Sequence, residues 1–142
     1  MHKNRSEVLR YLADLLERHR NYIIDANQSD ISTVKGEDPA LIDRLKADGK
    51  KINEMKMALL NTAMQDDPDG KVLYEYTNSE GLLFRNVTVP FGTILIIYES
   101  RPDVTIEATA MAFKSGNKII LKGGKEARNT NLYLVNLWKD AL

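Results

Sequence analysis

Two short polar loops carry the side chains that could do chemistry. Glu99–Ser100–Arg101–Pro102 directly follows one apolar run, and Lys122–Gly123–Gly124–Lys125 directly follows another. Arginine can bind a carboxylate or a phosphate through two parallel hydrogen bonds. Lysines beside glycines can also bind phosphate, because a glycine lets an anion approach the backbone closely. These residue types therefore indicate a site for a phosphorylated ligand, with the amides of a following helix N-terminus as further donors.

Each loop also has a simpler interpretation. The second loop matches neither G-x-x-x-x-G-K-[ST] nor G-x-G-x-x-G, so an ordinary strand-to-helix turn with solvated lysines explains it equally well. The first loop could be a strand end in which Glu99 forms a local salt bridge. Spacing by itself leaves both alternatives open.

The elements around the two loops predict how they are positioned. Residues 89–98 form a continuous apolar run, which is typical of a strand buried on both faces of a parallel sheet. Residues 103–115 have apolar side chains at helical spacing, and residues 118–122 form a second strand. A strand, a helix and a strand within about thirty residues make a βαβ unit. Ligands bind beyond the carboxyl ends of such strands, so both loops are expected to face one crevice.

The rest of the chain is predicted as helices and a hairpin. Residues 1–65 form a helical segment, with one amphipathic helix over 4–25, a polar exit at 26–30 and a loop over 31–37. Asp38–Pro39 begins a further helical stretch that ends near residue 64 and is interrupted at Gly49. Residues 71–89 form a β-hairpin after a turn, and the last segment, 125–142, is helical.

Composition restricts the class of protein. The chain has 142 residues and zero formal net charge, so one domain is expected and a dedicated nucleic-acid binder is not. It has no cysteine, which excludes a disulfide, a thiolate metal site and a cysteine nucleophile within these residues. No metal site is predicted, because His2 and His19 are isolated and Asp66, Asp67 and Asp69 lack the spacing of a calcium loop. No apolar run is long enough for a membrane span and no signal peptide is visible, so a cytoplasmic protein is expected.

At this point the residues show a resemblance to a known family. Several motifs carry it: 89–92, 97–105, 114–117 and 120–127, with weaker pieces at Ala26–Asn27, Asp30, Asp43–Arg44–Leu45, Asp67–Pro68 and Gly70. Together they resemble the γ-glutamyl phosphate reductases, also called glutamate-5-semialdehyde dehydrogenases, of the aldehyde dehydrogenase superfamily. The resemblance runs from about residue 5 to the last residue. It implies an α/β fold: a partial Rossmann-like cofactor-binding domain with N-terminal helices, a β-hairpin and a parallel βαβα unit over residues 90–142.

The resemblance also implies a reaction and its partners. Such enzymes reduce L-glutamyl 5-phosphate to L-glutamate 5-semialdehyde with NADPH, in cytoplasmic proline biosynthesis. Neither nucleic acid nor a membrane is expected as a partner. The full enzyme is expected to be a homo-oligomer, and glutamate 5-kinase is a candidate partner.

The same resemblance assigns roles to the two loops. Lys122 matches the lysine that contacts the adenosine ribose, and Lys125 aligns with a glutamate that binds ribose hydroxyls in NAD-preferring relatives. A cation there would favour the 2′-phosphate of NADPH, which a carboxylate would repel. Glu99, Ser100 and Arg101 occupy the place of the oxyanion asparagine, so Arg101 is a candidate contact for the substrate phosphate or reacting carbonyl. Gly123 and Gly124 complete the predicted cofactor-binding set.

The chain departs from the family in one decisive respect. These enzymes attack the acyl phosphate with a cysteine, which this chain lacks. The resemblance therefore predicts an incomplete NADPH-binding domain over residues 1–142, without the catalytic domain, without a catalytic residue and without reductase activity of its own. The alternatives are a stand-alone nucleotide-binding or regulatory module, and an α/β scaffold with no ligand.

Overall fold

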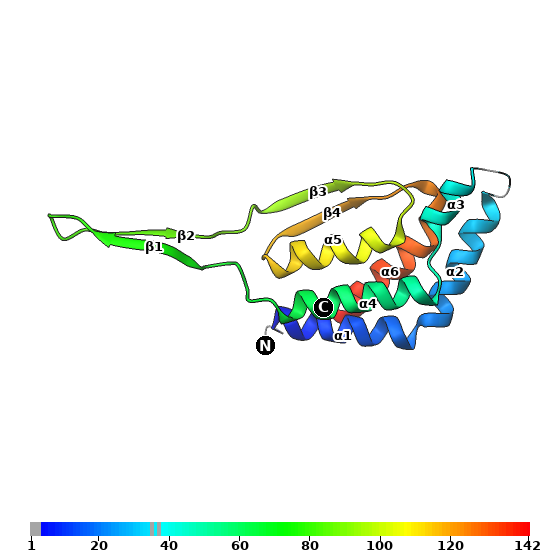
Figure 1. Ribbon diagram of the computed structural model, residues 1–142, viewed down its shortest axis with the longest axis horizontal. Helices are drawn as coiled ribbons and strands as arrows, with labels where there is room; N and C mark the ends of the chain where they lie inside the picture. Colours follow the sequence, from blue (N-terminus) through cyan, green and yellow to red (C-terminus); the bar gives the residue numbers. More distant parts are fainter. Residues whose placement is uncertain (1–3, 35, 37) are drawn as a thin grey trace.

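The computed structural model, which describes residues 4–34, 36 and 38–142, arranges helices beneath a small parallel sheet, from which a hairpin projects (Figure 1). This confirms the predicted α/β fold class. In chain order the elements are α1 (Arg5–Arg18), α2 (Arg20–Thr33), α3 (Pro39–Leu45), α4 (Gly49–Met64), β1 (Val72–Thr77), β2 (Leu83–Val87), β3 (Thr93–Ile97), α5 (Pro102–Lys114), β4 (Lys118–Lys122), the 3₁₀-helix η1 (Lys125–Ala127) and α6 (Arg128–Ala141).

The first predicted helix is two helices. The chain turns at His19, and α2 continues to Thr33, so the prediction of one helix over 4–25 with a polar exit at 26–30 is wrong. The polar residues of that exit are helical because two of them, Asn27 and Asp30, are buried and hydrogen-bonded to other elements. The loop predicted over 31–37 begins only after Thr33, and its positions 35 and 37 lie outside the described residues.

The second helical stretch is interrupted as predicted. Asp38 caps α3 by accepting a hydrogen bond from the amide of Ala40, and Asp48 caps α4 through the amide of Lys51. The break lies just before Gly49, which is the first residue of α4.

Both predicted strand pairs are present. β1 and β2 form an antiparallel hairpin, and β3 and β4 pair in parallel around α5, with Ile97 opposite Lys122 at the carboxyl ends. The hairpin extends away from the helices, and all its strand residues are exposed (Figure 1).

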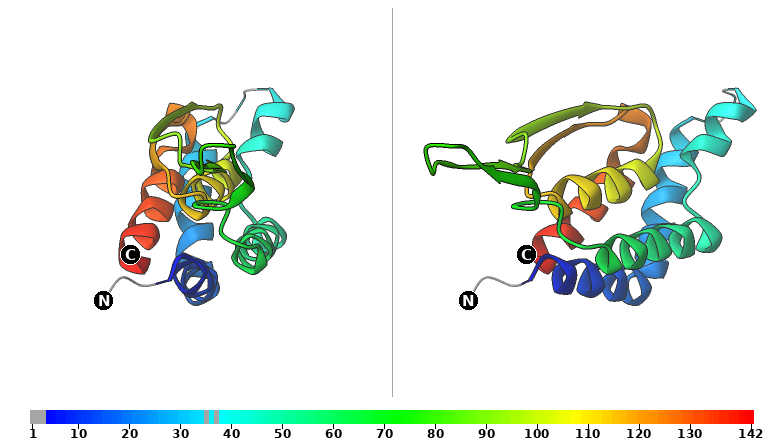
Figure 2. Two further views of the ribbon diagram at one scale, coloured as in Figure 1. Left: turned by 90° about the vertical axis from the view of Figure 1, so that its left-hand side faces the viewer. Right: turned by 60° about the vertical axis from the view of Figure 1, so that its left-hand side comes forward.

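One burial prediction is wrong. β3 and β4 were expected to be buried on both faces, but their side chains alternate between half-buried and exposed. Leu95 and Ile97 are 58% and 74% exposed, because α5 covers one face of the pair and no described element covers the other. The two views in Figure 2 show this sheet as an outer layer, with α5 and α6 beneath it and α1 and α4 beyond them.

The main core is helical. Its apolar side chains come from α1, α2, α4, α5 and α6, and burying them provides most of the stabilising free energy. Fully buried members include Leu9, Leu12, Leu16, Ile23, Ile52, Met55, Leu59, Ile106 and Leu134.

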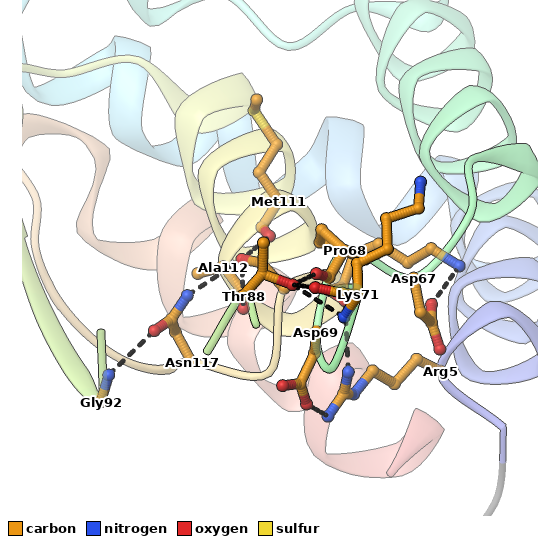
Figure 3. Close-up of polar contacts among 12 residues, drawn as sticks. Arg5, Asp67, Pro68, Asp69, Lys71, Thr88, Gly92, Met111, Ala112 and Asn117 are labelled. Atoms are coloured by element: carbon orange, nitrogen blue, oxygen red, sulfur yellow. Dashed lines mark hydrogen bonds and ion pairs between the residues drawn. The ribbon is translucent and has the colours of Figure 1, made fainter. Parts of the chain in front are cut away.

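Ion pairs fix the base of the hairpin to the helices (Figure 3). Arg5 of α1 pairs with Asp69 at 3.1 Å and also reaches the carbonyl of Lys114 at 3.5 Å. Lys114 is buried at the end of α5 and pairs with Asp67 at 2.6 Å. Thr88 closes the base of the hairpin through hydrogen bonds to the turn before β1. These contacts give the Asp67–Pro68–Gly70 turn a structural role.

A second buried network ties α2 to the start of α6. The Asp30 carboxylate accepts hydrogen bonds from the amides of Asn129 and Thr130, at 3.0 and 2.8 Å, and from the Thr130 hydroxyl at 2.7 Å. Asn27 donates to the carbonyl of Leu45 and accepts from the amide of Ala47, both at 2.8 Å. Because α6 has no cap from its own chain neighbours, Asp30 performs that role from another helix.

Replacing Asp30 with asparagine should therefore destabilise the fold. The variant replaces a carboxylate that accepts from three donors, two of them buried, so we expect the free energy of unfolding to fall by about 1 to 3 kcal/mol in urea titrations. Asp25→Asn, at an exposed position of the same helix, is the matched control and should change little. Equal stability of both variants would contradict this role.

Candidate functional site

The two predicted loops meet at the ends of β3 and β4. Ser100 Oγ donates a 2.8 Å hydrogen bond to Oε2 of Glu126, which joins the first loop to the residue after the second. A β-carbon at Gly124 would stand 2.5 Å from Ser100 Oγ, so the glycine permits this close approach. The two loops thus lie side by side, but the prediction that both face one crevice is not met, because no residue of Glu99–Ser100–Arg101–Pro102 lines the cavity beside the second loop.

A cavity of about 260 Å³ lies beside the second loop. Lys122, Lys125 and Arg128 supply cations to its wall, and Gly123 and Gly124 supply backbone. In the described part of the chain none of the three cations is ion-paired, and neither glycine amide donates a hydrogen bond. The remaining wall includes the apolar side chains of Leu121, Leu132 and Val135. Such a wall suits an anion attached to a less polar group.

The amides at the start of α6 contribute less than the sequence indicated. We expected a helix N-terminus to offer free N–H groups to phosphate, but the Asp30 carboxylate already accepts from Asn129 and Thr130. Its negative charge also offsets the positive end of the helix dipole. Anion binding here therefore depends on side chains and on the glycine backbone.

The carboxylate of Glu126 lies near these cations and accepts a hydrogen bond from the first loop. A hydrogen bond from its own backbone amide, the bond from Ser100, and the nearby charges of Lys125 and Lys122 hold the pKa of Glu126 below its ordinary value. The carboxylate is therefore ionised at neutral pH and fixed by Ser100, while the lysines form no direct ion pair with it.

The other two residues of the first loop point elsewhere. Glu99 pairs with Arg44 of α3 at 2.7 Å, which is a distant partner in sequence where a local one was considered. Arg101 pairs at 3.1 Å with the buried carboxylate of Asp103, which also lies 3.6 Å from the Lys51 ammonium. Neither Glu99 nor Arg101 lines the cavity beside Lys122. The structure thus brings together Ser100, Lys122, Gly123, Gly124 and Lys125, and separates Glu99 and Arg101 from them.

The charged cluster around Arg101 continues along α5. Burial, and then the neighbouring Asp103 carboxylate, raise the pKa of Glu107 above its ordinary value. Lys51 also pairs with Glu54 at 2.8 Å, so this cluster links α4 to the start of α5.

Three cavity residues escaped the sequence reasoning. Tyr98, Arg128 and Asn131 line the same cavity as the lysines. The Tyr98 hydroxyl lies 2.6 Å from Thr105 Oγ1, which in turn donates to Asn131 at 2.9 Å. Burial raises the pKa of the Tyr98 phenol, so the hydroxyl stays protonated and can donate at neutral pH. Arg128 could have been found from its spacing, because it lies three residues after Lys125 on the same helical path.

Neither a metal-binding group nor a membrane-spanning helix is found among the described residues. Among the described residues no group of three or more histidine, cysteine, aspartate or glutamate side chains is arranged to hold a metal ion. No helix in that part of the chain is long and apolar enough to cross a membrane.

Fold and site together define a class, an α/β domain whose parallel βαβ unit ends in a cationic, glycine-containing loop. The chain is homologous over nearly its whole length to gamma-glutamyl phosphate reductases. The relative from Aquifex aeolicus is 42% identical over 139 residues, which cover 96% of this chain and 32% of the relative. The relative from Carboxydothermus hydrogenoformans is 44% identical over 142 residues, with 99% and 34% covered. No protein-family model matches the chain.

Two solved structures of gamma-glutamyl phosphate reductases also match the chain. The gamma-glutamyl phosphate reductase of Thermotoga maritima superposes with a TM-score of 0.94 at 38% identity, covering 97% of this chain and 34% of that one. The Saccharomyces cerevisiae enzyme gives a TM-score of 0.90 at 37% identity, covering 96% and 35%. The chain thus spans about one third of the length of the relatives it matches.

The hydrogen bond from Ser100 to Glu126 should have a measurable effect on the pKa of the Glu126 carboxyl group. In Ser100→Ala the carboxylate loses a donor that favours its charged form, so the pKa of Glu126 should rise toward its ordinary value. Side-chain carboxyl NMR titration of both proteins measures the change. Ser115→Ala, at the other end of α5, is the control and should leave Glu126 unchanged. An unshifted pKa in Ser100→Ala would show that the two loops are not coupled this way.

Proposed function

We propose that this chain supplies the dinucleotide-phosphate-binding portion of a γ-glutamyl phosphate reductase, and that the dinucleotide is NADPH. The observation that carries the proposal is the unpaired Lys122 and Lys125 on either side of the Gly123–Gly124 backbone, beside a cavity at the strand ends. The homology to gamma-glutamyl phosphate reductases supports the same assignment. In this proposal residues 1–142 are an incomplete NADPH-binding domain of Rossmann-like type.

The lysines have distinct roles in the proposal. Lys122 ends β4 and contacts the adenosine ribose, whereas Lys125 faces the 2′-phosphate. A cation at residue 125 attracts that dianion, and a carboxylate there would repel it. Ser100 hydrogen-bonds the Glu126 carboxylate, which forms no direct ion pair with either lysine, so both ammonium groups stay available to a ligand. Arg101, held by Asp103, remains a proposed contact for substrate.

The whole protein in this proposal reduces L-glutamyl 5-phosphate to L-glutamate 5-semialdehyde and releases phosphate, in cytoplasmic proline biosynthesis. It would act as a homo-oligomer, with glutamate 5-kinase as a candidate partner that makes its acyl phosphate. The second candidate function is a nucleotide-binding module without catalysis, which the absence of cysteine from these residues fits as well as it fits the first proposal.

Replacing the lysines should weaken NADPH binding. Lys122→Ala and Lys125→Ala should each reduce affinity about tenfold, because each removes a charge-assisted contact to a phosphate or ribose oxygen. Titration followed by NADPH fluorescence gives the dissociation constants. Lys50→Ala, an exposed lysine on α4, is the control. If both site variants bind NADPH as tightly as the wild type, the assignment of the site is wrong.

The chain should not turn over substrate. With NADPH and L-glutamyl 5-phosphate we expect no loss of NADPH absorbance, since no cysteine is present to form the thioester that hydride would reduce. A spontaneous-hydrolysis blank without protein corrects for decay of the acyl phosphate. NADPH oxidation that depends on L-glutamyl 5-phosphate and exceeds that blank would contradict the proposal that this chain binds the cofactor without catalysing the reaction.

A further inference from the structure

Arg128 adds a third cation to the proposed site. It is the first residue of α6, it is exposed, and it lines the same cavity as Lys122 and Lys125. Its guanidinium forms no ion pair or hydrogen bond with the described residues. It is therefore free to bind a ligand in that cavity.

The position of Arg128 is electrostatically unfavourable in the empty site. Cations are disfavoured at a helix N-terminus, where the dipole is positive, yet Lys125 and Arg128 both lie there. Lys122 lies beside the same cavity, so like charges also repel one another. Asp30 offsets part of this charge, but its oxygens already accept three hydrogen bonds from Asn129 and Thr130. Departures from such local preferences are typical of functional sites. An anionic ligand would relieve the repulsion among the three cations.

We propose that Arg128 is a specificity-determining residue that, together with Lys125, binds the 2′-phosphate of the dinucleotide. This inference rests on the proposed function of the site and goes beyond it by adding a residue and a role. Arginine presents a planar pair of donors that matches a phosphate edge, which a lysine point charge cannot do. The helix amides are engaged by Asp30, so side chains carry the recognition of the dianion.

The clustering of cations favours a phosphate monoester over the pyrophosphate. All three cations line one cavity of about 260 Å³. A monoester near pH 7 carries a charge close to −2 on three oxygens, which suits several cations at one point. Arg128 should therefore affect ligands with a 2′-phosphate far more than ligands without it.

The test compares two nucleotides that differ in the 2′-phosphate. The chain is titrated by calorimetry with 2′,5′-ADP and with 5′-ADP at low salt, as wild type, Arg128→Gln, Arg128→Lys and the control Arg10→Gln, an exposed arginine of α1. We expect Arg128→Gln to weaken 2′,5′-ADP about tenfold and 5′-ADP less than twofold. Arg128→Lys should fall between wild type and Arg128→Gln, and Arg10→Gln should match wild type. Thermal unfolding of each variant confirms that it is folded.

The outcomes separate this inference from the proposed function. Equal weakening of both nucleotides, or no weakening, in Arg128→Gln overturns the role of Arg128. If Lys125→Ala still weakens 2′,5′-ADP in that case, the proposed dinucleotide site stands without Arg128. If the wild-type chain binds neither nucleotide, both the site and the role of Arg128 are overturned.

Discussion

The rest of the site depends on the hydrogen bonds that the buried Asp30 carboxylate accepts from Asn129 and Thr130. This carboxylate joins α2 to the first amides of α6, and α6 begins directly after the loop that carries the lysines. The position of that loop is thus determined by a helix far away in the sequence. A buried carboxylate is costly without partners, and here three donors compensate it. Asn27, one helical turn earlier, fixes the turn between α3 and α4 to the same helix.

This arrangement changes how the site can bind an anion. In many phosphate sites the free amides and dipole of a helix N-terminus supply the attraction. Here the Asp30 carboxylate already accepts from two of these amides, so in the proposed site the attraction would come from Lys122, Lys125 and Arg128. Side-chain charges can be changed by single substitutions without altering the helix. Asp30 therefore contributes to the stability of the fold, whereas the exposed cations would determine which ligand binds.

Local patterns in the sequence were enough to predict most elements. The hairpin, the βαβ unit, the caps Asp38 and Asp48, and the contact between the two loops all follow from turn chemistry, periodicity and strand order. The failures concern burial and long-range partners. The continuous apolar run of β3 could not reveal that one face is uncovered, because periodicity does not report what packs against a strand. Polar residues 26–30 looked like a helix exit because the partners of their buried members lie outside the helix, 18 and 20 residues away for Asn27 and 100 residues away for Asp30.

The net charge of the chain likewise does not report how charges are distributed locally. Zero formal net charge excludes a general attraction for polyanions, yet it places no limit on a local cluster. Three cations without an ion pair among the described residues line one cavity, and the nearby Glu126 carboxylate is hydrogen-bonded by Ser100. Over a Debye length of about 8 Å at physiological salt, a ligand senses this cluster and not the balanced remainder of the surface. In the proposed site, attraction for a small phosphorylated ligand would therefore be short-ranged and sensitive to salt, whereas nucleic acid, which requires an extended basic surface, would gain little.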